Sequence, residues 1–343
     1  MSQKVSLQDV AKVAGVSAMT VSRVINNHPR VLPKTAEKVQ KVIKDLGYTA
    51  VPSLRKRGRR SRAHTGIHTG QIALVLLGME ESFANNPVIG KTLHGIRSHL
   101  ASNDISTVLV PVQDQKQIPD ILDRRSIDGM IVTGEFPKDS FKEYFENMPL
   151  VYVYCLSNEI EMSYDQIMPD NKKVAELAAK NFLASGVKHC AFFDPSPNHP
   201  EFNIRGQEFL KLIQEAGGKV DMYLDKDLSA APESAEQDVD RLKFKKMIDR
   251  FLSDKNRAKA VFLPSDSVTA IFYRELRSQG YDPKDYKIIS CNQEKPYLEG
   301  LYPRPQSIDI QSKKIGVRAA ERLLERLGDS ELGTETILVD PKL

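Results

Sequence analysis

From Gln71 onward, short apolar runs alternate with longer amphipathic segments, and this alternation strongly constrains the fold. The apolar runs predict strands, and the segments between them predict helices. The expected strands are 72–77, 106–110, 129–132, 150–154, 189–193, 260–263 and 287–290, and the expected helices are 90–102, 171–185, 205–216, 243–253, 267–279 and 312–327. Because the strands are apolar almost throughout, they should form parallel sheets covered by helices on both faces. About 270 residues exceed one such sheet, so we expect two doubly wound α/β lobes with a ligand crevice at the carboxyl ends of their strands.

The start of the chain follows a different pattern, which predicts three short helices. Gly15 separates the first two helices, and Ser17 is placed to cap the second. The third helix should run from near Pro33 to Gly47, because apolar residues recur there at helical spacing. Residues 1–48 are therefore expected to form a small all-α domain.

The first two helices have the spacing of a helix-turn-helix. Ala11 is small where the helices would cross, Gly15 allows the turn, and Val21 anchors the second helix to the core. In this motif the second helix lies in the major groove of DNA. Its outer face should contact bases, and polar groups nearby should contact phosphates. The expected base contacts are Ala18, Met19 and Arg23, and the expected phosphate contacts are Leu7, Ser17, Thr20, Ser22 and Asn26.

The formal net charge of +4 hides an uneven distribution. Residues 1–62 hold 14 lysines and arginines against 3 acidic residues, whereas the rest of the chain holds 35 against 42. Six of the basic residues lie between Arg55 and Arg62, so residues 49–70 are expected to form a basic hinge or linker. A basic head on an acidic body indicates that one end of the chain meets a polyanion.

Composition and motifs exclude several classes of protein. The longest apolar run, 72–77, is far shorter than the roughly 20 residues of a membrane span. The N-terminus has no apolar signal-peptide core, and three scattered cysteines make no disulfide framework, so we expect a cytoplasmic protein. The Gly90-Lys-Thr92 stretch lacks the glycine that a P-loop requires five positions earlier. We therefore expect no catalytic residue, no metal and no cofactor.

The residues from Val5 to Asn26 closely resemble the N-terminus of the lactose-repressor (LacI/GalR) family of transcription regulators. The matching stretches here are Asp9-Val-Ala, Ala14-Gly-Val-Ser, Thr20-Val-Ser-Arg-Val-Ile-Asn, Thr35, Lys38-Val and Leu46-Gly-Tyr48. Weaker matches continue in the family's order at Ile72-Ala-Leu-Val, Asn86-Pro87, Ile127-Asp-Gly-Met-Ile-Val132, Asp170-Asn171, Arg205-Gly206, Ser265-Asp266, Ile288-Ile-Ser-Cys-Asn292 and Gln306-Ser-Ile-Asp309.

By this resemblance, residues 71–343 form an effector-binding and dimerisation domain with the fold of periplasmic sugar-binding proteins. Crossovers near 160–168, 291–294 and 325–330 would join an N-lobe of about 71–162 and 292–326 to a C-lobe of about 163–291 and 327–343. A homodimer would place two helix-turn-helix heads on a palindromic operator in double-stranded DNA. A small molecule between the lobes, a sugar or sugar derivative, would modulate repression. The effector-binding residues that the resemblance implies are Asn86, Phe202, Arg205, Asp266 and Asn292.

The linker departs from the family's pattern, in which a leucine of a hinge helix wedges into the minor groove. Arg57 stands at the position of that leucine, and Leu54 is the only apolar candidate, three residues earlier. Either the hinge re-registers around Leu54, or Arg57, with Arg55 nearby, enters the minor groove electrostatically. A disordered basic tether is the third interpretation.

The effector site departs as well, because Asn292 stands where the family has an acidic residue. An amide both donates and accepts hydrogen bonds, so a polar ligand is still expected. Arg205 also fits a surface position, Phe202 fits a core position, and Asp266 is also placed to cap a helix that begins at Ser267. Two other functions stay open: a cytoplasmic sugar-binding or sugar-processing protein, and a DNA binder without a functional effector site.

Overall fold

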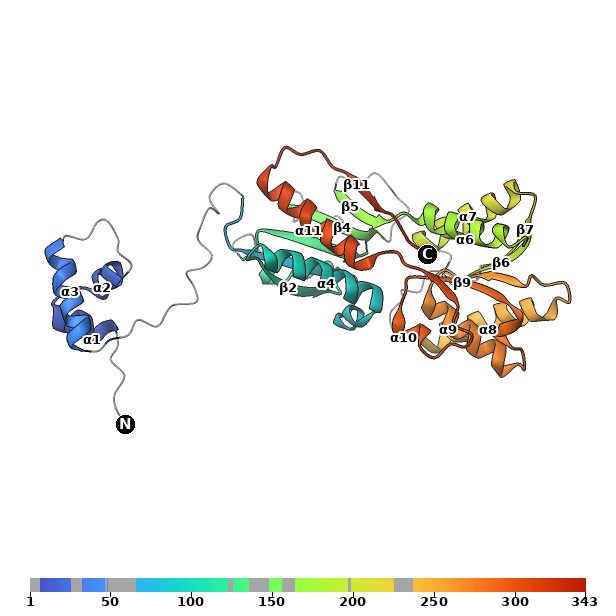
Figure 1. Ribbon diagram of the computed structural model, residues 1–343, viewed down its shortest axis with the longest axis horizontal. Helices are drawn as coiled ribbons and strands as arrows, with labels where there is room; N and C mark the ends of the chain where they lie inside the picture. Colours follow the sequence, from blue (N-terminus) through green and yellow to red (C-terminus); the bar gives the residue numbers. More distant parts are fainter. Residues whose placement is uncertain are drawn as a thin grey trace. The chain divides into compact units, whose positions relative to one another are not determined.

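The computed structural model describes residues 7–25, 33–46, 48, 66–122, 126–135, 148–155, 164–196, 199–224 and 237–343. The chain divides into two compact units, Met1–Arg60 and Ser61–Leu343. The first contains the helices drawn in blue in Figure 1, and the second contains two sheets with their helices. No helix among the described residues is long and apolar enough to cross a membrane.

The smaller unit has the three helices that the sequence predicts, α1 (Leu7–Ala14), α2 (Ala18–Ile25) and α3 (Pro33–Asp45). Their inner faces form one apolar core of Val10, Ala11, Ala14, Val21, Val24 and Val39. Gly15, between α1 and α2, has a φ of +64°, a left-handed conformation that glycine adopts without steric cost. The tight turn between the two helices therefore depends on this glycine.

The first sheet of the larger unit is parallel and has six strands, in the order β11-β5-β4-β3-β1-β2. These are β1 (Gln71–Leu77), β2 (Ser106–Val112), β3 (Gly129–Gly134), β4 (Leu150–Cys155), β5 (Asp165–Pro169) and β11 (Thr336–Val339), and two short 3-10 helices, η3 (Glu81–Asn85) and η4 (Asp120–Leu122), lie in the connections. Helices α4 (Pro87–Ser102) and α11 (Ser312–Gly328) pack side by side (Figure 1). A Cβ atom at Gly95 or Gly316 would lie 2.2 or 2.1 Å from a backbone oxygen of the other helix, so this approach requires both glycines.

The second sheet is also parallel and has five strands, in the order β10-β9-β8-β6-β7. Its strands are β6 (His189–Asp194), β7 (Lys219–Leu224), β8 (Ala260–Phe262), β9 (Lys287–Cys291) and β10 (Gln306–Ile308), and its helices are α6 (Asn171–Ala184), α7 (Pro200–Glu215), α8 (Gln237–Ser253), α9 (Asp266–Ser278), α10 (Lys295–Leu298) and the 3-10 helix η5 (Pro283–Asp285). The neighbouring Phe192 and Phe193 of β6 point to opposite faces. Phe192 packs against Phe209 of α7, and Phe193 packs against Phe251 of α8 and Phe272 of α9, so helices cover both faces.

The lobe boundaries differ from those expected. β5 pairs with β4 and β11 in the six-stranded sheet, so the N-lobe runs to Pro169 and contains β11 in addition to α11, which was expected there. β10 pairs with β9, so the chain stays in the C-lobe past 291–294. The expected crossovers were therefore wrong: the chain passes between the lobes at about 169–171, 309–311 and 339–342. Near the C-terminus, which lies between the lobes in Figure 1, Lys342 forms an antiparallel bridge with Asp309.

The end of the expected linker belongs to the larger unit. The backbone N–H groups of His68, Thr69 and Gly70 donate to the Asp128 carboxylate over 2.8, 2.8 and 2.6 Å. Gly66 lies so close to α11 that a Cβ there would come within 2.1 Å of the Leu327 carbonyl oxygen. Residues 66–70 are therefore packed, and the loose linker expected over 49–70 ends before Gly66. Residues 49–65 lie outside the described part of the chain.

Candidate functional site

Helix α2 is positioned by its cap and its buried face. The Ser17 hydroxyl accepts a hydrogen bond from the Thr20 backbone N–H over 3.1 Å and lies 2.9 Å from the Thr20 hydroxyl, which confirms Ser17 as the cap. Val21 and Val24 are buried in the core of the smaller unit. Since side chains on a helix repeat every three to four residues, this packing directs Arg23 outward, and Arg23 is exposed.

The other expected DNA contacts have different outcomes. Ala18 is half-buried and packs against the core of the smaller unit, so its expected outward orientation was wrong in part, because the first turn of α2 lies close to that core. Ser17 and Thr20 remain at least partly accessible. The side chains of Leu7, Met19 and Ser22, and the residues Asn26, Leu54, Arg55 and Arg57, lie outside what the structure describes, so these DNA contacts stay predictions.

Arg205 of α7 is fully buried and connects three segments of the C-lobe. Its Nε donates to Asn171 Oδ1 over 2.8 Å, and its Nη1 donates to the Pro264 carbonyl over 2.6 Å and to Asn292 Oδ1 over 3.2 Å. The fourth neighbour is Glu201, one turn earlier, whose Oε2 lies 3.8 Å from Nη2. Arg205 is therefore not the surface residue that one interpretation allowed. A buried guanidinium with these partners is held in one orientation.

Asn292 links Arg205 to a cluster of buried acids. Its amide donates to Glu294 Oε2 over 3.2 Å, and the Glu294 backbone N–H donates to Asp266 Oδ2 over 2.6 Å. Asp266 also accepts from the hydroxyls of Ser290 and Ser307, over 2.5 and 3.0 Å. Burial, followed by the charge of nearby Asp266, raises the pKa of Glu294 to about 7. The acids on this edge of the sheet therefore titrate above their ordinary range.

The first residues of α7 carry polar atoms that have no partner. His199 Nδ1, Glu201 Oε1 and Arg205 Nη2 are buried and make no hydrogen bond with the residues that the structure describes. Burial, followed by the charge of Arg205, lowers the pKa of His199 to about 4, so its ring is neutral at pH 7. The Phe202 ring stacks on His199 at 4.2 Å between centroids and lies 6.0 Å from the Arg205 guanidinium. Buried polar atoms without partners are uncommon, and they point to a ligand that would satisfy them.

Side chains of the N-lobe face this cluster. The Lys91 ammonium of α4 donates to the Gln293 carbonyl, in the loop that carries Asn292. The Tyr154 hydroxyl, at the end of β4, lies 2.9 Å from the Thr92 hydroxyl. Burial raises the pKa of Tyr154, and the charges of Glu201 and Arg205 also act on it, which places this tyrosine near α7. The two lobes therefore meet at the carboxyl ends of their sheets, where a ligand site is expected.

The structure brings together four of the five expected effector residues. Arg205 bonds Asn292, Asp266 joins them through Glu294, and Phe202 lies beside Arg205. The interpretation of Asp266 as a helix cap was wrong, because Ser265 accepts from the Val268 N–H and caps α9. The fifth, Asn86, is an exposed cap of α4, whose Oδ1 accepts from the N–H groups of Val88 and Ile89.

Sequence reasoning missed four members of this cluster, His199, Glu201, Asn171 and Glu294. The one available signal was the spacing of Glu201 and Arg205, which places an acid and a base on the same face of a helix. That signal was missed because α7 was expected to begin at Arg205, whereas it begins at Pro200. Asn171 had been noted only as part of a family match, and its contact with Arg205 spans 34 residues.

Comparisons with known proteins agree with this arrangement. Residues 6–50 match the model of "Bacterial regulatory proteins, lacI family", and residues 179–343 match that of "Periplasmic binding protein-like domain". The chain is 24% identical over 345 residues to the HTH-type transcriptional repressor PurR of Mannheimia succiniciproducens, covering 98% of this chain and 96% of the relative.

Solved structures share the fold. The lac repressor dimer bound to operator and the anti-inducer ONPF matches with a TM-score of 0.68 and 18% identity, covering 99% of this chain and 97% of that one. The complex of the transcriptional regulator CelR with cellobiose matches with a TM-score of 0.66 and 21% identity, covering 98% and 97%. The helix-turn-helix head therefore matches the lacI family of bacterial transcription regulators, and the body matches a periplasmic-binding-protein-like domain and shares the fold of the lac repressor.

Proposed function

We propose that this regulator binds a palindromic operator as a homodimer in the cytoplasm, and that a small polyhydroxylated molecule between its lobes changes its operator affinity. The observation that carries the proposal is the buried Arg205 cluster, in which His199, Glu201 and Arg205 each hold a polar atom that makes no hydrogen bond with the described residues. Such a site suits a ligand that offers several hydrogen bonds.

Hydroxyl groups suit this site because each one donates and accepts. Phe202 supplies a flat apolar surface beside the polar atoms, an arrangement that fits the carbon face of a sugar ring. The solved structure of CelR with cellobiose, which shares this fold, supports a sugar as the ligand. These points favour repression that a sugar or sugar derivative modulates.

The ligand can act on DNA binding only by favouring one arrangement of the lobes over another. A contact between the lobes is present next to the site: the Lys91 ammonium of the N-lobe bonds the Gln293 carbonyl of the C-lobe. A ligand that changes this contact would alter how the N-lobe holds the ends of the two linkers in a dimer. By linkage, operator DNA must change the affinity for the ligand by the same factor.

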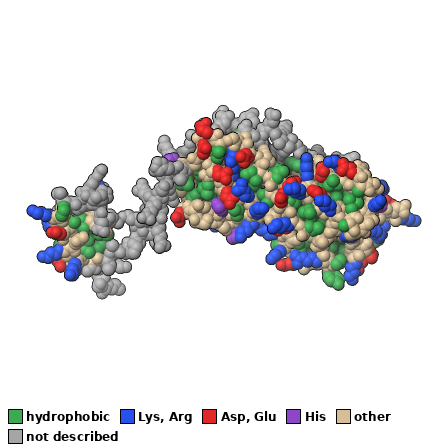
Figure 2. Space-filling view, turned by 45° about the horizontal axis from the view of Figure 1, so that its top comes forward, with side chains coloured by type: hydrophobic (Ala, Val, Ile, Leu, Met, Phe, Trp, Pro, Cys, Tyr) green, Lys and Arg blue, Asp and Glu red, His purple; other side chains and the backbone are tan. Residues whose placement is uncertain are grey.

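The charge distribution supports DNA binding through the smaller unit and the linker. Residues 1–62 hold the basic excess, whereas acidic and basic side chains are intermixed over the face of the larger unit in Figure 2. Cations that neutralise phosphates make operator affinity fall steeply with salt. Insertion of Leu54, or of Arg57 and Arg55, into the minor groove remains part of this proposal.

The test begins with selection of bound DNA from random sequence, using the full chain. Operator affinity is then measured with and without a panel of sugars, for the wild type, for Arg205→Gln and for the control Arg318→Gln, which changes a partly exposed arginine of α11. Arg205→Gln should bind operator like the wild type and lose its response to the sugar, while the control keeps both. An unchanged response in Arg205→Gln, with circular dichroism showing a native fold, would contradict the proposed site.

A further inference from the structure

We infer that the effector site selects a neutral polyhydroxylated ligand over its phosphorylated or carboxylated forms, and that Glu201 enforces this choice. The inference rests on the proposed function, because it concerns the ligand of the same site. It is carried by the charges and the free hydrogen-bonding atoms of the buried cluster.

The positive charge of Arg205 is already offset. Three of its hydrogen bonds go to oxygens of Asn171, Pro264 and Asn292, and Glu201 lies 3.8 Å from the remaining Nη2. The Glu201 side chain is 13% exposed and that of Arg205 is 1% exposed, so the two groups interact where screening by water is weak. Burial raises the pKa of Glu201, and the charge of Arg205 opposes that rise and favours the ionised carboxylate. Arg205 can therefore still donate a hydrogen bond through Nη2, but it offers an anion little net charge.

The described side chains around Arg205 include more acidic than basic groups. Asp266 and Glu294 are buried beside the loop that carries Asn292, and Lys91 is the cation that acts on both of them. Among the described residues, three carboxyl groups, those of Glu201, Asp266 and Glu294, therefore lie near the two cations Lys91 and Arg205, and burial raises the pKa of all three carboxyl groups. A phosphate or carboxylate placed there would be brought close to buried acids, which costs free energy through repulsion and desolvation.

The free atoms also need opposite kinds of partner. Glu201 Oε1 requires a donor, and Arg205 Nη2 requires an acceptor. Two neighbouring hydroxyls of a sugar satisfy both, because one donates to the carboxylate while the other accepts from the guanidinium. An ionised phosphate or carboxylate offers acceptors only, so it would leave Glu201 Oε1 unpaired. Charge and hydrogen bonding therefore favour the same class of ligand.

The experiment uses the full chain and matched forms of the same sugars: glucose with glucose 6-phosphate and glucuronate, ribose with ribose 5-phosphate, and cellobiose with cellobionate. Dissociation constants are measured by calorimetry. For the sugar that binds, the neutral form should bind at least about tenfold tighter than its anionic form, a difference of ~1.4 kcal/mol. Glu201→Gln should reduce this ratio by about tenfold or more. Glu208→Gln, which removes an acid elsewhere on α7 where it pairs with Lys211, should leave the ratio unchanged.

Each other result counts against the inference. If an anionic form binds tighter and also changes operator affinity, the charge preference is wrong while the proposed function stands. If no form of any sugar binds or alters operator binding, both are overturned. If Glu201→Gln and Glu208→Gln keep the same ratio as the wild type, Glu201 does not enforce the choice.

Discussion

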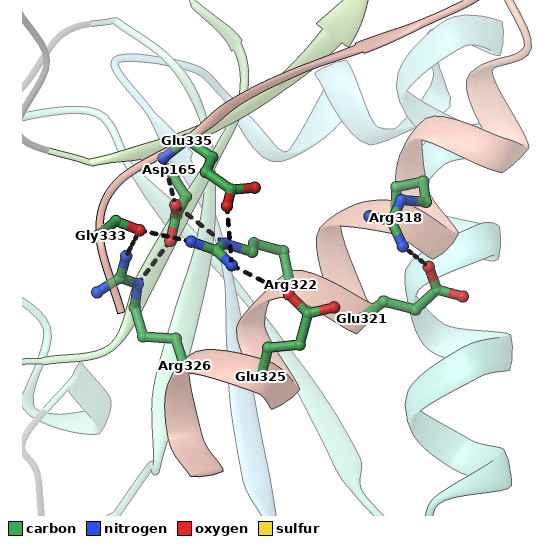
Figure 3. A network of polar contacts seen from close by, with 8 residues as sticks. All are labelled: Asp165, Arg318, Glu321, Arg322, Glu325, Arg326, Gly333 and Glu335. Carbon is green, nitrogen blue, oxygen red and sulfur yellow. Dashed lines mark hydrogen bonds and ion pairs between the residues drawn. The ribbon is translucent and has the colours of Figure 1, made fainter. Parts of the chain in front are cut away.

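Asp165→Asn should destabilise the N-lobe far more than the loss of the partly exposed ion pair between Arg318 and Glu321 of α11. Asp165 begins β5 and is fully buried; its Oδ1 lies 3.0 Å from Arg322 Nε and its Oδ2 lies 2.5 Å from Arg326 Nε (Figure 3). It also accepts from the Glu335 backbone N–H over 2.8 Å, so it joins α11 to the segment that leads into β11.

The magnitude follows from burial. Asparagine fills the same volume without the charge, and it leaves Arg322, whose side chain is 4% exposed, beside a neutral amide. Removing one partner of a buried ion pair costs about 3–5 kcal/mol when the remaining charge stays uncompensated. Glu325 and Glu335, at 47% and 60% exposure, still pair with Arg322 over 3.1 and 3.9 Å, so the cost should lie at the lower end of that range. The matched control is Glu321→Gln, which breaks the pair with Arg318 at 33% and 36% exposure and should cost about 0–1 kcal/mol.

The assay is urea unfolding of the full chain, followed by circular dichroism, since the chain has no tryptophan. The midpoint should fall clearly for Asp165→Asn and barely for Glu321→Gln, with the dependence of the unfolding free energy on urea unchanged. Equal losses in the two variants would refute the reasoning, because they would show that burial of Asp165 does not determine the cost of its charge.

Two further changes test the linker anchor and the DNA contact. Asp128→Asn should cost about 1–3 kcal/mol of stability, because one backbone N–H among His68, Thr69 and Gly70 would then face an amide N–H₂. Burial opposes ionisation of Asp128, but the three backbone hydrogen bonds hold its pKa below the usual value. The wild type should therefore have its full stability advantage over Asp128→Asn above the ordinary pKa of an aspartate and lose it as the pH falls through the lowered pKa. A difference in urea midpoints that does not depend on pH would contradict this. Arg23→Ala should cost about 1–3 kcal/mol at one operator position, measured by competition between operator variants, whereas a uniform loss across all sequences would make Arg23 a phosphate contact.

Elements with a strong local signal could be predicted from the sequence. The three helices of the smaller unit and the apolar strands β1, β3 and β4 lie where apolar spacing places them, because one face of each helix and both faces of each strand are buried. Four strands of the described residues were missed, β5, β7, β10 and β11, and two of these have weak local signals. β5 begins with the polar pair Asp165 and Gln166, and β10 has only three residues. Each forms a strand because a neighbouring strand supplies hydrogen-bond partners for its backbone N–H and C=O groups.

The candidate site could be predicted only in part, because its contacts join residues that are far apart in the sequence. Arg205 and Asn292 were identified by resemblance, yet they lie 87 residues apart, and only folding brings them into hydrogen-bonding contact. The only local signal of Glu201 is its i,i+4 spacing from Arg205, which exposed ion pairs on helices share. Its burial beside Arg205 is a consequence of packing around α7.

By itself, the sequence determined the helix-turn-helix head, the alternating α/β body and the separation of basic from acidic parts. These follow from the order of residues, because helical periodicity, strand hydrophobicity and charge are local quantities. Tertiary structure alone decided which lobe holds β5 and β11, and that residues 68–70 are anchored to Asp128. It also decided that three buried atoms of His199, Glu201 and Arg205 make no hydrogen bond with the described residues. Those features depend on which distant residues pack against a side chain and exclude water from it, and these contacts form only when the chain folds.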